Sequence, residues 1–294
     1  MSSKKKIVVA GGNGFLGSRI CKSAVSRGWD VVSISRSGEP VWSSVTSSPN
    51  PPPWSKSVSW QKADLLKPTT YKPILKDADA VVHTMGILLE ADYKGVITGK
   101  ESIWGGLSRA FSATKRGSQN PLERKEGEAL EPQEKDGQLT YELMNRDSGT
   151  SAPSITLAQE SAFEKVSTFV FISAAAGAPM LPSRYITTKR EAESTIASSL
   201  PKLRSIFIRP GFLYDSSRAF TMPIAFFGGA GHMVNSALGG RLTWLAGAAV
   251  EKPLKADLVA EAVVEAIGDE STNGVVGTGE IEALANKAWR RAML

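Results

Sequence analysis

The chain has 294 residues, 41% of them hydrophobic and 22% charged, which is typical of a globular protein long enough to bury a full core. Its net charge of +6 and pI near 9.3 fit an acidic cofactor, an anionic membrane surface or a basic compartment. The basic residues are spread along the chain, which argues against nucleic acid as a partner. Cys21 is the only cysteine, which excludes an intramolecular disulfide framework and a cysteine metal site. We predict no metal-binding residues.

The first predicted strand, residues 7–10, leads into the glycine-rich segment 11–17, and an amphipathic helix is expected from about Ser18. Glycines let such a turn approach a pyrophosphate, whose charge then lies at the positive end of the helix. This arrangement predicts a dinucleotide site. The expected contacts with the cofactor are Gly11, Asn13, Gly14, Phe15, Leu16 and Gly17.

The second predicted strand, residues 31–34, ends in Ser35, Arg36 and Ser37, where a dinucleotide fold carries an acidic residue for the ribose 2′-hydroxyl. A guanidinium flanked by hydroxyls suits a 2′-phosphate instead. Ser35 and Arg36 therefore favour NADP(H) over NAD(H), and the alternative is that Arg36 is a solvated loop residue. The proline-rich and serine-rich segment 39–57 is expected to form a mobile loop.

Further strands are predicted at 58–60, 80–83, 169–172 and 206–208, in alternation with helical runs, and Asp257 is the expected N-cap of a C-terminal helix. This rhythm predicts an α/β protein with a Rossmann doubly wound parallel sheet and helices on both faces. The loops after these strands supply further candidate cofactor contacts, namely Asp64, Leu65, Gly86 and Pro210, and the candidate catalytic residue Ser173.

Two segments do not fit this rhythm. Residues 92–139 are too long for an ordinary connection and are either disordered or ordered only on a partner. Residues 219–240 contain no charged residue except for histidine, but their proline and glycines interrupt the apolar continuity that a membrane span requires. A lid over a lipophilic substrate, a patch resting on a membrane, and a buried loop and helix all remain open for this second segment.

Tyr185 and Lys189 form a YxxxK pattern at the start of a predicted helix, where a spacing of four places both side chains on one face. An ammonium beside a phenol favours the phenolate, so Tyr185 is a candidate general acid or base. The same lysine is a candidate to hold the ribose hydroxyls of the nicotinamide half of the cofactor. The alternative is an exposed tyrosine and a solvated lysine.

In these features the chain resembles the short-chain dehydrogenase/reductase superfamily, in its extended or atypical epimerase/dehydratase-like branch. Gly11, Gly14 and Gly17 match the GxxGxxG of that superfamily, and Asn145 falls on the helix usual between the fourth and fifth strands. Asp64-Leu65, Gly86, Ser173, Tyr185, Lys189 and Arg209-Pro210 also follow in the expected order. The resemblance implies a Rossmann domain over 1–215 and a small C-terminal substrate subdomain over 216–294, partly interleaved with the core.

The chain also resembles fungal mitochondrial epimerase/dehydratase-like proteins of coenzyme Q biosynthesis. This likeness rests on GGNGFLGSRIC at 11–21, SISRSG at 33–38, VVHTMGILLE at 81–90, YITTKREAE at 185–193 and IRPGFLYD at 208–215. It implies a location on the matrix side of the inner mitochondrial membrane and a role in ubiquinone synthesis within a multi-protein assembly. Only six residues precede the first strand, so we expect any import signal to be internal.

One departure from the family pattern concerns the substrate-binding hydroxyl after the fifth strand, because Ala174 occupies its place. Ser173 substitutes for it only if the loop shifts by one residue. Two hypotheses follow. The protein is an NADP(H)-dependent oxidoreductase on a lipophilic quinone intermediate, with Tyr185, Lys189 and Ser173 as catalytic residues, or it is a nucleotide-binding assembly or regulatory subunit. The accessory subunit of respiratory complex I, which looks similar, serves assembly in this second way.

Overall fold

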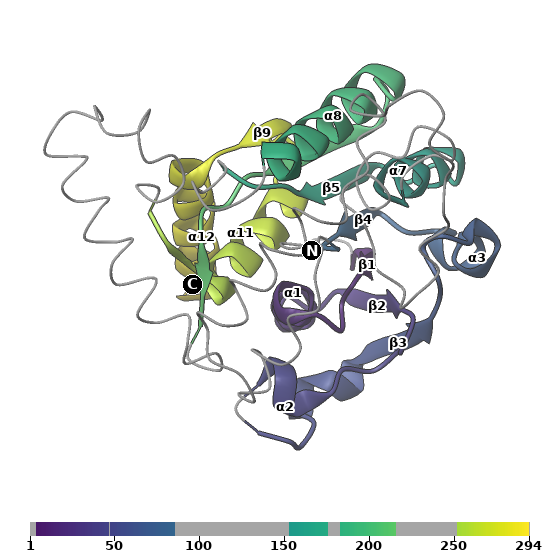
Figure 1. Cartoon of the computed structure of the whole chain (residues 1–294). Helices are drawn as coiled ribbons and strands as arrows, with labels where there is room; N and C mark the ends of the chain where they lie inside the picture. Colours follow the sequence, from purple (N-terminus) through teal and green to yellow (C-terminus); the bar gives the residue numbers. More distant parts are fainter. Residues whose placement is uncertain (1–3, 47, 86–152, 176–182, 216–251, 294) are drawn as a thin grey trace, which may run out of the picture.

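Seven parallel strands form the central sheet of the protein, which a computed structural model describes at residues 4–46, 48–85, 153–175, 183–215 and 252–293 (Figure 1). The side chains of 183–185 are not described. The sheet order is β3 (Val58–Lys62), β2 (Asp30–Ser35), β1 (Lys6–Ala10), β4 (Ala80–His83), β5 (Thr168–Ile172), β6 (Arg204–Ile208) and β9 (Gly274–Val276). The predicted α/β class and doubly wound parallel sheet are confirmed.

Helices cover both faces of this sheet (Figure 1). One face carries α1 (Phe15–Ser26), α11 (Ala256–Gly268) and α12 (Thr278–Met293), and the other carries α3 (Lys72–Leu75), α7 (Pro153–Phe163) and α8 (Ser183–Ser199). The strands are apolar throughout because successive side chains enter opposite layers. Ile7 and Val9 pack with the helices of the first face, whereas Val8 and Ala10 pack with those of the second.

The order of the strands reverses between β1 and β4. From β1 the chain continues to β2 and β3 on one side, and from β4 it continues to β5 and β6 on the other. In an open parallel sheet, a ligand binds at the carboxyl ends of the strands beside such a reversal. Gly11 follows β1 and Thr84 follows β4, so both lie at this point. The topology therefore places the glycine-rich turn where a dinucleotide site is expected.

Two predicted helix starts differ from the structure. Helix α1 begins at Phe15 rather than near Ser18, because Gly14 is the N-cap and its backbone is still extended. Asp257 is not the N-cap of α11; Lys255 holds that position, and Asp257 lies in the first turn. An acidic side chain there still interacts favourably with the positive end of the helix.

The segment predicted as a mobile loop contains two short helices, α2 (Trp42–Val45) and η1 (Pro53–Ser57). Trp42 contacts the rings of Trp54 and Trp60 at centroid distances of 5.7 Å, and Trp54 and Trp60 are 6.4 Å apart. Because aromatic rings bury large apolar areas, this tryptophan cluster anchors the segment against α1 and β3. The segment is therefore not a plain loop. The prediction weighed the prolines and overlooked the tryptophans, and the mobility of the segment stays a prediction.

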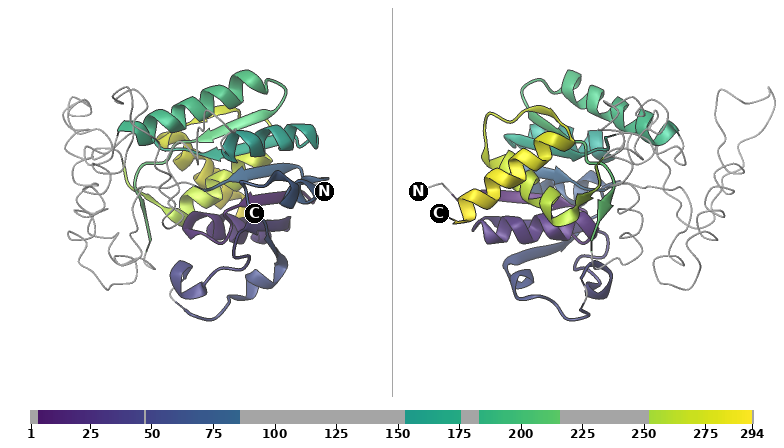
Figure 2. Two further views of the ribbon diagram at one scale, coloured as in Figure 1. Left: turned by 45° about the vertical axis from the view of Figure 1, so that its right-hand side comes forward. Right: turned by 90° about the vertical axis from the view of Figure 1, so that its left-hand side faces the viewer.

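The C-terminal part of the chain extends the Rossmann core. β9 pairs with β6, α11 packs against α1, and α12 lies against α11 (Figure 2). Three further short elements are η2 (Pro68–Thr70), β7 (Leu213–Tyr214) and β8 (Leu254–Lys255), and the last two pair with each other. The predicted boundary between residues 215 and 216 borders the undescribed range 216–251, so the division into two domains remains a prediction.

Several sequence predictions fall on residues that the structure does not describe. These are the insertion at 92–139, the apolar segment 219–240, Gly86 and Asn145. In the described ranges, no helix combines the length and apolar character needed to cross a bilayer.

Candidate dinucleotide-binding site

The glycine-rich turn is packed so tightly that side chains are excluded from it. Gly11 has a φ of +82°, and a Cβ atom there would lie 2.7 Å from Thr84 Oγ1. A Cβ atom at Gly17 would lie 2.2 Å from the carbonyl oxygen of Gly11. The Gly14 N–H donates to that same oxygen at 2.9 Å, which closes the turn. The predicted glycines therefore bring the start of α1 directly against the end of β1, as a pyrophosphate cradle requires.

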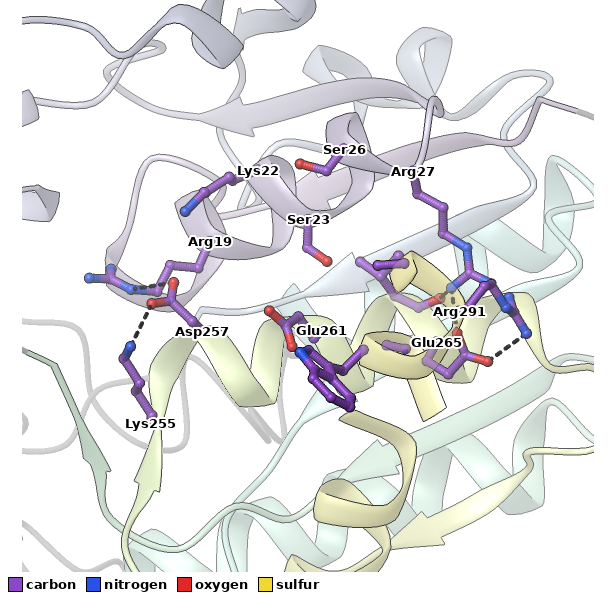
Figure 3. A pocket seen from close by; sticks show the side chains of 14 residues that line it. Arg19, Lys22, Ser23, Ser26, Arg27, Lys255, Asp257, Glu261, Glu265 and Arg291 are labelled. Carbon is purple, nitrogen blue, oxygen red and sulfur yellow. Dashed lines mark hydrogen bonds and ion pairs between the residues drawn. The ribbon is translucent and has the colours of Figure 1, made fainter. Parts of the chain in front are cut away.

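Ion pairs to the C-terminal part of the chain hold α1 on its outer side. The buried guanidinium of Arg19 pairs with Asp215 at 2.6 Å and with Asp257 at 3.5 Å. At the other end of α1, Arg27 pairs with the fully buried Glu265 at 2.8 Å, and Arg291 of α12 reaches the same carboxylate (Figure 3). A pocket of about 500 Å³ between α1, α11 and α12 is lined by all of these residues except Asp215. The helix that carries the glycine turn is thus fixed from outside the candidate site.

Of the other predicted contacts near the turn, Phe15 and Leu16 begin α1. The Arg19 guanidinium lies 4.4 Å from the centroid of the Phe15 ring, and Leu16 is buried in the core. Asn13 reaches across to the end of β2, where its Nδ2 donates to Ser37 Oγ at 2.7 Å. The turn and the loop after β2 are therefore joined by a direct hydrogen bond.

The loop after β2 presents Arg36 outward. The Ser35 hydroxyl is buried; it donates to the Gly38 carbonyl and accepts from the Gly38 N–H, both at 2.9 Å. Ser35 therefore shapes the loop through its own hydrogen bonds. Arg36 is exposed and has no ion pair within the described ranges. The structure brings Arg36 to the carboxyl edge of the sheet but does not test its predicted contact with a phosphate.

The loops after β3 and β4 complete this side of the site. Asp64 is half-buried, and its Oδ1 accepts the Leu66 N–H at 3.1 Å, while Leu65 is buried. After β4, the Thr84 hydroxyl donates to the Ala10 carbonyl at 2.8 Å. That bond ties the end of β4 to the end of β1. Gly86, two residues further, lies outside the described residues.

Lys189 lies on the opposite side of the strand reversal and is almost completely buried. Its Nζ donates to the Ile172 carbonyl at 2.8 Å and lies 4.7 Å from the centroid of the Phe171 ring. Burial lowers the pKa of Lys189 to about 8, although nearby Glu193 opposes this change. Its bond to Ile172 holds Lys189 next to Ser173, the following residue. The structure therefore brings these two predicted residues together.

Tyr185 belongs to the first turn of α8, one turn before Lys189. Its side chain is outside the described set, so its predicted role remains a prediction. His83 lies beneath this region at the end of β4, with its ring centroid 5.5 Å from that of Phe171. Both nitrogens of His83 are buried without a hydrogen-bond partner in the described part of the chain. Burial, with a smaller contribution from the charge of Lys189, lowers the pKa of His83 to about 3.

Sequence reasoning missed the arginine that holds the loop after β5. Arg190 donates to Ser173 Oγ at 3.1 Å and to the carbonyl oxygens of Ala174 and Ala175 at 2.7 and 2.9 Å. The buried carboxylate of Glu193 accepts from Arg190 at 2.7 Å and also pairs with Arg209. We call Arg190, Glu193 and Arg209 the arginine–glutamate network.

This network determines what the loop after β5 offers. The Ser173 hydroxyl accepts from Arg190, so its own proton is free to be donated. Ala174 has no hydroxyl, and its carbonyl is held by the same arginine. Pro210, a predicted cofactor contact, accepts the Ala175 N–H at 2.8 Å and fixes the other end of the loop. The sequence signal that could have indicated part of this network is the spacing of three between Arg190 and Glu193 on a predicted helix, which allows an ion pair.

The fold and the site define a nucleotide-binding protein of the Rossmann type. Residues 7–93 match the NAD dependent epimerase/dehydratase family. The chain is 38% identical over 229 residues to "MIOREX complex component 2" of Saccharomyces cerevisiae, a match that covers 75% of this chain and 77% of the yeast protein. This chain belongs to the NAD dependent epimerase/dehydratase family. Its family implies a nicotinamide dinucleotide as the cofactor, and the tight glycine cradle fits that group.

Solved structures agree on the fold. A UDP-N-acetylglucosamine 4-epimerase from Methanobrevibacter ruminantium M1 superposes with a TM-score of 0.54 at 17% identity, over 94% of this chain and 76% of that one. Vestitone reductase from alfalfa superposes with a TM-score of 0.52 at 14% identity, over the same shares of the two chains. At such low identity, these likenesses show the fold alone.

Proposed function

We propose that this chain is an NADP(H)-dependent oxidoreductase that acts on a quinone-ring intermediate of mitochondrial ubiquinone biosynthesis. The observation that carries the cofactor assignment is the exposed guanidinium of Arg36, without an ion pair in the described ranges, at the carboxyl end of β2. A free cation at that position is complementary to a 2′-phosphate, and the strand end offers no carboxylate for a ribose hydroxyl.

The chemistry proposed for the opposite side of the site uses three residues. Bound NADP(H) supplies or accepts a hydride, and the chain must then move a proton. Tyr185 supplies or takes that proton, and Lys189 favours the phenolate by its charge. Ser173 donates its free hydroxyl proton to a substrate oxygen, because its oxygen already accepts from Arg190.

The setting proposed for this reaction is the matrix side of the inner mitochondrial membrane, within the assembly that makes ubiquinone. Support comes from the resemblance to fungal coenzyme Q proteins and from the yeast relative, whose name describes a component of a complex. A lipophilic quinone substrate and peripheral contact with the membrane both belong to this proposal. The apolar segment 219–240 is the candidate for either contact.

A second candidate function is that of a nucleotide-binding assembly or regulatory subunit without catalysis. The specific observation in its favour is Ala174, which leaves the loop after β5 with one hydroxyl where the family pattern carries a further Ser or Thr. Loss of one such donor costs about 3 kcal/mol of transition-state stabilisation in comparable sites. Under this alternative, nucleotide binding stabilises the protein for its partners.

Two substitutions in cells distinguish these functions. Tyr185→Phe removes the proton donor and leaves the glycine turn intact, whereas Gly14→Asp places a negative charge at the turn itself. If the protein is an enzyme, Tyr185→Phe lowers ubiquinone output at an unchanged protein level. If it is a nucleotide-binding subunit, Tyr185→Phe has no effect and Gly14→Asp abolishes output. An unchanged output with both variants contradicts both functions.

A further inference from the structure

Lys62 lies at the same edge of the sheet as Arg36, although the two residues are far apart in sequence. It is the last residue of β3, and the parallel register pairs it with Ser35, the last residue of β2. The Ala63 N–H then donates to the Ser35 carbonyl at 2.9 Å, so the pairing continues past the strand end. The neighbouring positions of these two strand ends place Lys62 beside the loop that carries Arg36.

The side chain of Lys62 runs along that loop. A Cβ atom at Gly38 would lie 3.2 Å from Lys62 Cγ and 3.6 Å from Lys62 Cε. Gly38 has a φ of +77°, and its backbone holds the Ser35 hydroxyl from both sides. The aliphatic stem of Lys62 therefore packs against the closed end of the loop. Its ammonium group is one bond beyond Cε and lies next to the Arg36 loop.

Within the part of the chain that the structure describes, neither cation has an acidic side chain as an ion-pair partner. Arg36 and Lys62 are both exposed. Each of two nearby carboxylates has a donor of its own. Glu39 accepts from Trp42 Nε1 at 3.0 Å, and Asp64 accepts the Leu66 N–H. Two like charges on neighbouring loops repel each other, and a bound dianion relieves that repulsion.

A hydroxyl donor completes the set. Ser37 Oγ accepts from Asn13 Nδ2 at 2.7 Å, so its own proton is free for an acceptor above the loop. A phosphate monoester is close to doubly charged at neutral pH and has three strong acceptor oxygens. A guanidinium, an ammonium and a hydroxyl match that group in both charge and donors.

We propose that Lys62 is the second cation of the 2′-phosphate site and, with Arg36 and Ser37, sets the preference for NADP(H). This inference rests on the proposed function, because it concerns the same cofactor. The sequence pattern did not indicate Lys62. The dinucleotide fingerprint is read at Arg36, and Lys62 lies more than 20 residues later in the chain. Only the register of β2 and β3 and the contact with Gly38 place Lys62 beside the loop that carries Arg36.

The test is a titration of the full chain with NADPH and with NADH, for wild type and three variants. Lys62→Met keeps the length of the apolar stem and removes the charge. Lys56→Met is the matched control, because Lys56 is exposed in η1 at the amino end of the same strand. Arg36→Met reports on the first cation. Thermal melts of all four proteins establish that they are folded.

We expect Lys62→Met to weaken NADPH binding about 10-fold, which corresponds to one charge-assisted hydrogen bond. NADH binding should change less than about 2-fold, and Lys56→Met should change neither affinity. If Arg36→Met weakens NADPH binding and Lys62→Met does not, the inference on Lys62 is wrong and the proposed cofactor stands. The inference is also wrong if Lys62→Met weakens both nucleotides equally, or if Lys56→Met matches it. If wild type does not prefer NADPH, the proposed cofactor preference fails first.

Discussion

The two halves of the candidate site are built in different ways. Around Gly11, Gly14 and Gly17, the backbone itself makes the site, and its shape depends on the absence of side chains. Around Lys189 and Ser173, side chains make the site, through buried hydrogen bonds and the arginine–glutamate network. The first half combines a tight turn between close neighbours in sequence, Gly11 to Gly17, with contacts from that turn to Thr84 and Ser37. The second depends on contacts between β5, α8 and the end of β6, so it is more sensitive to changes elsewhere in the chain.

The largest effect is expected in the glycine half. Gly17→Ala places a Cβ atom 2.2 Å from the Gly11 carbonyl oxygen, and backbone cannot yield as a flexible side chain does. We expect loss of measurable NADPH binding and a decrease of about 3 kcal/mol in the free energy of unfolding. Fluorescence titration and urea unfolding measure the two quantities.

Gly279→Ala is the control for that substitution, because Gly279 also lies in the first turn of a helix and a Cβ atom there meets nothing within 4 Å. It should leave NADPH binding unchanged and should not destabilise the protein. Normal NADPH binding by Gly17→Ala would show that the turn is not as rigid as the geometry requires.

The next effect is expected in the network half. Glu193→Gln removes the charge of a carboxylate that pairs with the guanidinium groups of both Arg190 and Arg209. We expect a loss of about 2 kcal/mol in unfolding free energy, because two partly buried cations lose their counter-ion. NADPH affinity should change little, since Glu193 does not contact the glycine turn.

Glu282→Gln is a suitable comparison for Glu193→Gln. Glu282 pairs with Lys252 at 2.5 Å near the surface, where such a pair is worth about 0.5 kcal/mol or less. If Glu193→Gln proves as mild as Glu282→Gln, the network does not hold the loop after β5. If it abolishes NADPH binding, the two halves are not separate in the way described.

A third effect, which appears only as the pH decreases, concerns His83, between the two halves. Its pKa is lowered to about 3 in the folded protein, whereas an unfolded histidine titrates near 6.5. The unfolded state therefore binds a proton that the folded state does not, and stability falls as the pH decreases from about 6.5 toward 3. At pH 5 this costs about 2 kcal/mol, at 1.36 kcal/mol for each pH unit.

His83→Leu removes the titratable imidazole and fills the buried position with an apolar side chain. Between pH 8 and pH 5, the unfolding free energy of wild type should fall by about 2 kcal/mol more than that of the variant. An identical pH dependence of the two proteins would mean that His83 is protonated, or solvated, in the folded state.

The two halves also differ in how far they could be predicted from sequence. The strand ends and the glycine turn follow from local apolar runs and glycine spacing, and the structure confirms the parallel sheet that they predicted. Arg190 and Glu193 were not predicted, because their roles arise only when α8 packs over β5 and β6. Lys62 was missed for the same reason, since only the β2–β3 register brings it to Arg36. Side-chain sites assembled from distant segments leave no local pattern.

The central claim is that the carboxyl end of β2 is built for a 2′-phosphate, and the most direct test is the affinity of the wild-type protein for NADPH relative to NADH. The account predicts that NADPH binds at least about 10-fold more tightly at low ionic strength, because Arg36 and Lys62, which have no ion pair within the described ranges, meet a dianion. Added salt should narrow the difference, since the charges are exposed. Equal or tighter binding of NADH would contradict the account.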